Sequence, residues 1–372
     1  DALERCTRLA AELRDAETEA DCQSRLGTER RALFELPAAV RAYQKAILAY
    51  ATKGSRNEIY PRRYLGFLYE SGLNNFDKAL EQFQAAQAVA SRLALHDIEA
   101  ELLLDAARIY RQVASYDDAV EYAERAARLA EEQAPTVRGQ ASLELAKIEW
   151  YRGNYRRARA HETTALMLAR TRADVFLEIQ SLSLEGLIAV NQGDFVAAER
   201  SIEAALSLAR RSGRRSEEAA QLNNLGFVRR ESGKLVAAAL DFRSALVIDE
   251  SLGSDEGRAY DLRNLAIALA RQGDASQALA HLEQALVLSR KTSSRYNELQ
   301  SLLARAQIFE SLADARATED YQASLALSRS LQVPEVEWSA LYGLARVSEG
   351  AGNRGAARRL AGEALVVAEQ LG

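Results

Sequence analysis

Few residues in the chain have the chemistry that catalysis or metal binding needs. The 372 residues include three histidines, His96, His161 and His281, which lie far apart in the sequence and predict no shared metal site. The two cysteines, Cys6 and Cys22, have no histidine nearby in sequence that could activate a thiolate nucleophile. They could meet across a first pair of helices, and we expect them to be buried free thiols that act as small hydrophobic side chains.

A phosphate-binding loop of the GxxxxGK type is also missing from the sequence. Since there is neither a nucleophile beside a base nor a cluster of metal ligands, we expect the chain not to be an enzyme and to use no metal or cofactor. The three histidines are expected to face solvent or to have structural hydrogen bonds.

Charge and composition argue against further classes of protein. The net charge is −5 and the pI is about 5.6, without the basic excess that binds nucleic acid or an anionic membrane. No apolar run approaches the roughly 20 residues that span a bilayer. Arginine outnumbers lysine by 42 to 6, which is typical of a GC-rich bacterial genome. We therefore expect a bacterial, cytoplasmic protein that binds neither nucleic acid nor membrane.

The composition also predicts helix nearly throughout. Alanine contributes 70 residues and proline only 4, and alanine favours helices whereas proline interrupts them. Runs of β-branched and aromatic residues are scarce, which argues against a β or α/β fold.

A repeat of about 40 residues runs along the whole chain. Nine units at this spacing cover residues 20–372, and residues 1–19 are predicted to be the second helix of a further half unit. One small residue recurs early in each unit, at Gly27, Gly66, Ala107, Ala146, Gly186, Gly226, Ala266, Ala306 and Ala345.

Residues 219–257 show how one unit should fold. Leu222 and Leu225 belong to a pattern of apolar residues at three- and four-residue spacing, which predicts an amphipathic helix. Gly233 suits the left-handed position that ends such a helix, and Phe242 lies on the apolar face of a second helix. A single helix pair cannot bury its apolar face alone, so the units must stack on one another.

This pattern resembles the tetratricopeptide repeat, in which leucine and a small residue precede a Gly-Asp or Gly-Asn turn, and alanine and an aromatic residue follow. Residues 221–253 are similar to the longer repeats of kinesin light chain and of the mitotic-spindle adaptor with GoLoco motifs. Similar bacterial arrays precede CHAT-type caspase-like protease domains or occur in regulatory ATPases. The sequence departs from the pattern by one extra residue near Asn74 and Asn75, and by the absence of a turn glycine near Leu312.

The resemblance implies an all-α fold, a right-handed α-solenoid of nine helix-turn-helix units that follows the half unit. Residues 20–372 would then form a single elongated domain after the half repeat at residues 1–19.

In tetratricopeptide relatives, partner peptides lie on the concave surface that the first helix of each unit forms, so the resemblance implies a binding groove. Asparagine amides there can hold a peptide backbone, and arginines can receive a carboxylate. The alternative is that these asparagines are merely tolerated on an exposed helix. Transferred unit by unit, the implied binding residues are Asn223, Asn224, Phe227, Arg230, Tyr260, Arg263, Asn264 and Arg271.

The second full unit carries a different patch on the same implied surface. Tyr60 and Arg63, together with Tyr64 and Phe67, could anchor an apolar side chain of a partner. Packing against the neighbouring unit is an equal alternative for Tyr64 and Phe67.

The resulting hypothesis is a non-catalytic scaffold that binds a protein or peptide in its groove. The alternative is a sensor region of a larger enzyme, a CHAT-type protease or a regulatory ATPase, whose catalytic domain lies outside this chain. Self-association through the exposed half unit is a third possibility.

Overall fold

The computed structural model describes residues 2–73, 75–132 and 137–371, and within these ranges it contains helices and no strands. The elements in chain order are α1 (Ala2–Glu12), α2 (Ala16–Ala32), α3 (Leu36–Thr52), the 3₁₀ turn η1 (Arg56–Glu58), α4 (Ile59–Phe67), the π-helical turn η2 (Leu68–Gly72), α5 (Phe76–Arg92), α6 (His96–Gln112), α7 (Tyr116–Glu132), α8 (Arg138–Tyr151), α9 (Tyr155–Arg172), α10 (Val175–Asn191), α11 (Phe195–Arg211), α12 (Arg215–Glu231), α13 (Leu235–Leu252), α14 (Asp255–Arg271), α15 (Ala275–Lys291), α16 (Arg295–Ser311), α17 (Arg316–Leu331), α18 (Pro334–Gly350) and α19 (Arg354–Leu371).

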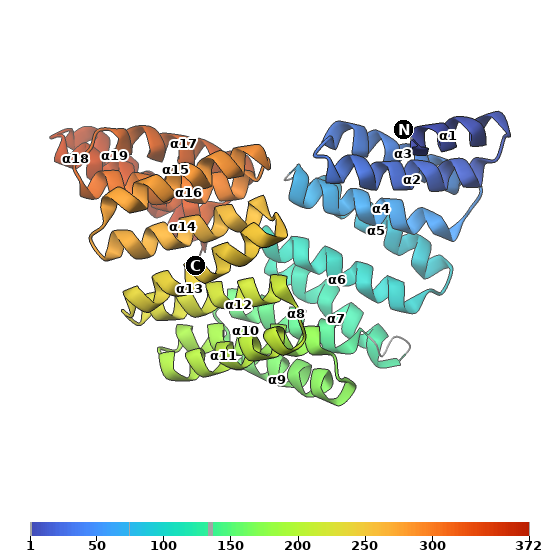
Figure 1. Cartoon of the computed structure of the whole chain (residues 1–372), viewed down its shortest axis with the longest axis horizontal. Helices are drawn as coiled ribbons and strands as arrows, with labels where there is room; N and C mark the ends of the chain where they lie inside the picture. Colours follow the sequence, from blue (N-terminus) through green and yellow to red (C-terminus); the bar gives the residue numbers. More distant parts are fainter. Residues whose placement is uncertain (1, 74, 133–136, 372) are drawn as a thin grey trace. The chain divides into compact units, whose positions relative to one another are not determined.

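The described helices form nine successive pairs, from α2 with α3 to α18 with α19, and α1 precedes them and packs against α2 (Figure 1). First helices of neighbouring repeats also touch: α6 contacts α8, α12 contacts α14, and α14 contacts α16. This repeat arrangement within the described residues confirms the predicted all-α solenoid of helix pairs.

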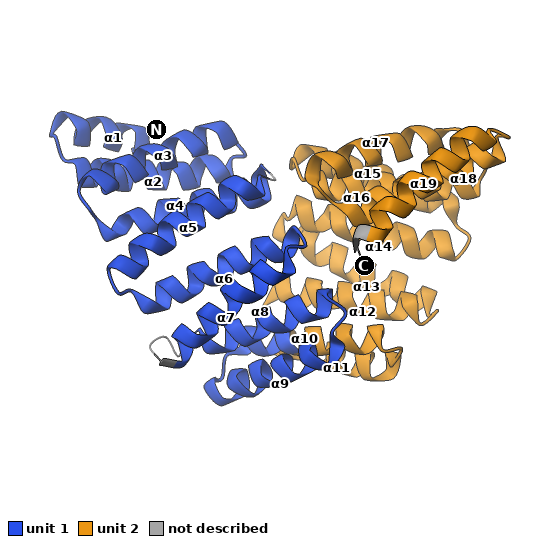
Figure 2. Cartoon of the chain, turned by 180° about the vertical axis from the view of Figure 1, so that it is seen from behind, with its two compact units in different colours: residues 1–181 blue, residues 182–372 orange. Residues whose placement is uncertain are grey.

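The chain divides into two compact units, residues 1–181 and residues 182–372 (Figure 2). The boundary falls within α10, in the fifth pair, and the two units are described separately below. The single elongated domain over residues 20–372 therefore stays a prediction.

The recurring small residue allows the two helices of a pair to approach closely. In the pair of α12 and α13, a Cβ atom added to Gly226 would lie 2.7 Å from the ring of Phe242. The same arrangement occurs in unit 1, where a Cβ atom on Gly66 would lie 2.6 Å from the ring of Phe83. The predicted role of the small residue is confirmed at both positions.

The turns between paired helices use a left-handed residue, as the glycine pattern predicts. Gly233 has φ +81° between α12 and α13. In the eighth pair, where the sequence lacks a turn glycine, Ala313 adopts φ 52° in its place. This backbone conformation is less favourable for alanine than for glycine, so the turn at Ala313 is locally strained.

The extra residue of the second unit coincides with a change of helix type. The π-helical turn η2 follows α4, and a π turn holds one residue more than an α turn. Asn75 then caps α5 by accepting a hydrogen bond from the backbone N–H of Lys78 at 3.0 Å. Asn74, which the sequence pattern also marked, lies outside the described residues.

The prediction of two free thiols is wrong. Cys6 of α1 and Cys22 of α2 form a disulfide, with their Cα atoms 6.1 Å apart. The two positions do meet across the first helices, as expected, and a Cα separation of this size is within the range of disulfides. Burial alone could not distinguish a thiol from a disulfide.

Among the described helices, none combines the length and the apolar character needed to cross a membrane.

Candidate peptide-binding surface

The eight residues implied in unit 2 lie on the first helices α12 and α14, which contact each other; α14 also contacts α16. The structure brings them together on neighbouring helices, but it places them in three different environments. Some are buried and bonded between repeats, some are ion-paired at the surface, and one arginine is buried without a carboxylate.

Asn223 and Asn264 are buried and bonded to each other. The Asn264 side-chain amide donates to the side-chain oxygen of Asn223 at 3.2 Å, and the Asn223 amide donates to the carboxyl group of Asp261. These bonds join α12 to α14, so the two amides stabilise the contact between repeats. The side chain of Asn223 is bonded through both its nitrogen and its oxygen, whereas Asn264 makes the single bond to Asn223.

Asp261 is fully buried, and its environment favours a neutral carboxyl group. Its pKa is raised to about 8, chiefly by burial; the hydrogen bond from Asn223 opposes this shift, and the nearby carboxyl group of Asp249 adds to it. Burial also raises the pKa of Asp249. At neutral pH we therefore expect Asp261 to hold a proton and to act as part of a neutral polar cluster with Asn223 and Asn264.

Asn224 is only half-buried. Its amide donates to the hydroxyl oxygen of Ser183 at 2.8 Å and to the side-chain oxygen of Gln221 at 3.3 Å. Among the described residues nothing donates to its own side-chain oxygen, which leaves that acceptor available to a ligand.

Arg263 is 7% exposed and has no carboxylate partner in the described part of the chain. One guanidinium nitrogen, Nη1, donates to the side-chain oxygen of Asn297 at 3.1 Å. The guanidinium group also lies 4.6 Å from the ring centroid of Tyr260, a cation–π arrangement. Burial lowers the pKa of Arg263, and the positive charge of Arg230 adds to the effect.

Arg230 and Arg271 share one carboxylate. Arg230 donates to Glu231 at 2.9 Å, and Arg271 donates to the same oxygen at 3.3 Å. Arg230 also covers the ring of Phe227, with 5.2 Å between its guanidinium carbon and the ring centroid. One acidic side chain therefore faces two cations here, and this part of the surface keeps a positive excess.

The implied patch in unit 1 separates into two environments. Arg63 is ion-paired with Glu101 and, at 2.6 Å, with Asp105. Tyr60 and Tyr64 remain 46% and 38% exposed and line a pocket described below.

Phe67 of that patch packs inside unit 1. Its ring lies between Arg63 and Arg108, whose guanidinium carbons are 5.6 Å and 5.3 Å from the centroid. It also makes an edge contact with Phe83. The packing alternative therefore holds for Phe67.

The histidines do not converge on a site. The Nδ1 atoms of His96 and His281 are buried without a hydrogen-bond partner in the described structure, which differs from the expected satisfied side chains. Burial lowers the pKa of His281. Over the described ranges no group of three His, Cys, Asp or Glu side chains is placed to hold a metal ion.

Comparison with known proteins agrees with this architecture. The tetratricopeptide repeat family model matches residues 61–132, which include α5, α6 and α7. These helix pairs are tetratricopeptide-like repeats. No curated protein sequence matches the chain at a significant level.

Solved structures resemble the repeats over most of the chain. A Rap protein complexed with competence and sporulation factor is 14% identical, with TM-score 0.65 over 95% of this chain and 98% of that chain. The Rap conjugation gene regulator of plasmid pLS20, in complex with the Phr* peptide, is 15% identical, with TM-score 0.60 over 91% of this chain and 96% of that one. At such identities the likeness establishes the fold alone.

A third structure is a signal transduction ATPase with numerous domains and a tetratricopeptide repeat sensor from Pyrococcus horikoshii. It is 14% identical, with TM-score 0.57, and the match covers 89% of this chain and 51% of that chain. The present chain therefore corresponds to about half of that larger protein.

Several residues of the surface did not emerge from the sequence pattern. Asp261, Asn297 and Ser183 complete the bonds of the implied asparagines and arginine. These bonds between tetratricopeptide-like repeats span about one repeat length: Asn223 meets Asp261 38 residues on, and Asn224 meets Ser183 41 residues back. Pairing polar residues about one repeat apart would have narrowed the search for both partners.

Proposed function

We propose that the chain is a non-catalytic interaction scaffold whose first-helix surface in unit 2 binds a peptide through a carboxylate received by Arg263. The observation that carries this proposal is a buried guanidinium group with a single hydrogen bond and no ion pair among the described residues. The carboxylate would come from an acidic side chain or from the end of the peptide.

An unpaired buried cation is unfavourable, because its lost hydration is not replaced by a counter-ion. The arginines on the first helices of unit 1 avoid this penalty: Arg108 pairs with Glu70 at 2.9 Å, and Arg111 pairs with Glu144 at 2.7 Å. Arg263 differs from them in having no ion pair with a carboxylate among the described residues, so an anion from a partner would supply the missing counter-charge. The bidentate fork of arginine matches a carboxylate in geometry.

The groups around Arg263 suit a peptide. Tyr260 is exposed beside the guanidinium group and offers a flat apolar surface, and Arg271 adds positive charge at the end of the same helix. The free side-chain oxygen of Asn224 can accept a backbone N–H from an extended chain. The solved Rap complex with the Phr* peptide supports a peptide as the class of partner.

The test screens a random peptide library, displayed with free carboxyl termini, against the wild-type protein and the Arg263→Gln variant. The proposal expects peptides with a carboxylate at a fixed position, and weaker binding of those peptides to the variant. Arg243→Gln, which changes an exposed arginine on α13, is the matched control and should bind like wild type. If Arg263→Gln keeps full affinity for every selected peptide, the assignment of Arg263 is wrong.

The second candidate is a sensor region of a larger enzyme, favoured by the ATPase of which this chain matches about half. The full-length product of the gene decides between the two. A P-loop or a His–Cys dyad in a further domain would support a regulatory ATPase or a CHAT-type protease, and a product without either would support the stand-alone scaffold.

We further propose that the partner is a protein or peptide rather than nucleic acid or membrane, because the chain has a net charge of −5 and lacks a strong overall basic excess. We propose a cytoplasmic location, where the disulfide between Cys6 and Cys22 would be exposed to cellular reductants. Self-association through α1 is proposed as a secondary property, and light scattering across concentrations tests it.

A further inference from the structure

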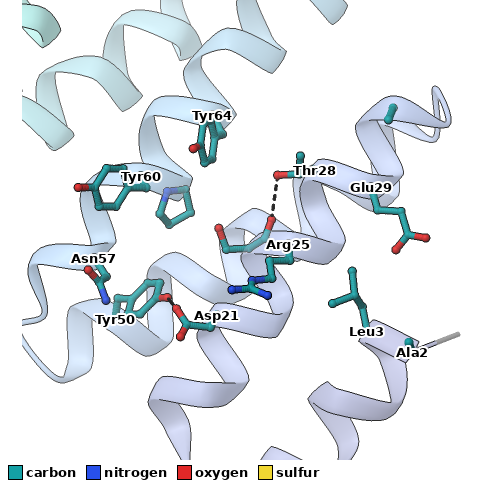
Figure 3. A pocket seen from close by; sticks show the side chains of 13 residues that line it. Ala2, Leu3, Asp21, Arg25, Thr28, Glu29, Tyr50, Asn57, Tyr60 and Tyr64 are labelled. Carbon is teal, nitrogen blue, oxygen red and sulfur yellow. Dashed lines mark hydrogen bonds between the residues drawn. The ribbon is translucent and has the colours of Figure 1, made fainter.

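A pocket of about 760 Å³ lies in unit 1, apart from the surface around Arg263 (Figure 3). Its walls come from α1, α2, α3, η1 and α4. This volume is in the range of about 300–1,000 Å³ that small-molecule sites usually have. Leu3 of α1 is among the lining residues, and the disulfide between Cys6 and Cys22 ties that helix to α2.

One wall of the pocket is aromatic. Tyr50 of α3 and Tyr60 and Tyr64 of α4 line it, and the last two expose nearly half of their surface. The Tyr50 hydroxyl donates to the carboxylate of Asp21, as the dashed line in Figure 3 shows, so the polar ends of these two residues are satisfied. The exposed faces of Tyr60 and Tyr64 can pack against a ring of the ligand.

The wall that α2 contributes carries charges of alternating sign. Asp21, Arg25 and Glu29 follow one another at four-residue spacing on α2 and all line the pocket. Opposite charges at this spacing usually pair on a helix. Within the described structure, however, the side chains of Arg25 and Glu29 form no hydrogen bond or ion pair, and Oε2 of Glu29 is buried without a partner.

We propose that this pocket binds a small aromatic zwitterion, such as a free aromatic amino acid. The ring would lie against Tyr60 and Tyr64, the carboxylate would accept hydrogen bonds from Arg25, and the ammonium group would donate to Glu29. A zwitterion supplies both missing partners at once, because an α-amino acid carries its two charges on one carbon. A ligand with a single charge leaves one of the two side chains unpaired.

This site is separate from the peptide surface of unit 2, so either proposal can fail without the other. The experiment is calorimetric titration of the full chain with L-phenylalanine and with its two singly charged fragments, phenylacetate and phenethylamine. We expect L-phenylalanine to bind more tightly than either fragment. Arg25→Gln should weaken L-phenylalanine and phenylacetate by about ten-fold each and leave phenethylamine unchanged.

Glu29→Gln should show the reverse pattern, weakening L-phenylalanine and phenethylamine but not phenylacetate. Arg31→Gln, an exposed arginine of the same helix outside the pocket, is the matched control and should change none of the three. Tyr60→Leu should weaken L-phenylalanine while the circular dichroism spectrum stays unchanged.

Three results would overturn the proposal. L-Phenylalanine that fails to bind the wild-type protein at millimolar concentration would remove the ligand class. A fragment that binds as tightly as the zwitterion would show that one of the two charges is unused. Equal losses in the Arg25, Glu29 and Arg31 variants would show that the effect is general rather than local to the pocket.

Discussion

Replacing Asp261 with asparagine should stabilise the protein at neutral pH and flatten the pH dependence of its stability. In the folded protein burial raises the pKa of Asp261 to about 8 from a usual value of 3.8. Asparagine has nearly the same shape as a protonated aspartic acid, and its side-chain oxygen can still accept the hydrogen bond from Asn223. The variant therefore keeps the neutral cluster and removes the titration.

The magnitude follows from the proton balance. Between about pH 4 and pH 8 the folded chain holds a proton on Asp261 that the unfolded chain has released, so the free energy of unfolding falls as pH rises. Each pH unit in this window lowers it by about 1.4 kcal/mol. From pH 5 to pH 7 this one residue should thus lower the free energy of unfolding by about 2.7 kcal/mol in wild type and not in Asp261→Asn.

The assay is urea unfolding of both proteins at pH 5, 6 and 7, followed by circular dichroism. Asp255→Asn is the matched control, because this carboxyl group at the start of the same helix has a lowered pKa, through its hydrogen bond with Lys291, and is already ionised at pH 5. The control should keep the wild-type slope with pH. If wild type and Asp261→Asn lose stability equally between pH 5 and pH 7, the neutral carboxyl group is refuted.

Three further results are expected. Reduction of the disulfide between Cys6 and Cys22, which are 16 residues apart, should destabilise the attachment of α1 by about 3 kcal/mol. Hydrogen exchange in residues 2–12 should then become faster, and unchanged exchange would contradict this prediction. Asn264→Ala should lower the free energy of unfolding by about 1–3 kcal/mol, because it leaves a buried partner unsatisfied. Asn224→Ala should lower it less and should weaken the binding of the selected peptides. The opposite order of stabilities in denaturant titrations would argue against these assignments. Gly226→Ala should lower the free energy of unfolding by about 1–3 kcal/mol, since the new methyl group would lie 2.7 Å from the ring of Phe242. A melting temperature equal to that of wild type would show that the two helices can move apart to admit the methyl group.

The repeat could be predicted from sequence because each unit uses the same local device. Gly226 must be small to admit Phe242, and Gly233 adopts a left-handed conformation, so a small residue recurs in every repeat and a turn glycine in many of them. Where the turn glycine is missing, as at Ala313, the backbone still adopts the left-handed conformation, and the local sequence does not predict this.

The contacts of the proposed surface could be predicted only in part, because they depend on pairs between repeats. The sequence pattern places Arg263 on a first helix, where the structure has it, but its burial and its lack of an ion pair among the described residues depend on the neighbouring helices. Asn223 and Asn264 were expected to face a partner, and they bond instead to each other and to Asp261. The disulfide was missed for a similar reason, since two buried cysteines look alike in sequence whether or not their sulfur atoms meet.

The most direct test of the peptide-binding account compares one selected peptide in two forms, with its carboxylate intact and with that carboxylate converted to an amide. The account predicts that amidation weakens binding to wild type by about ten-fold or more, and that Arg263→Gln binds both forms equally weakly. If wild type binds the amidated peptide as tightly as the free acid, Arg263 does not receive a carboxylate and the central claim is contradicted.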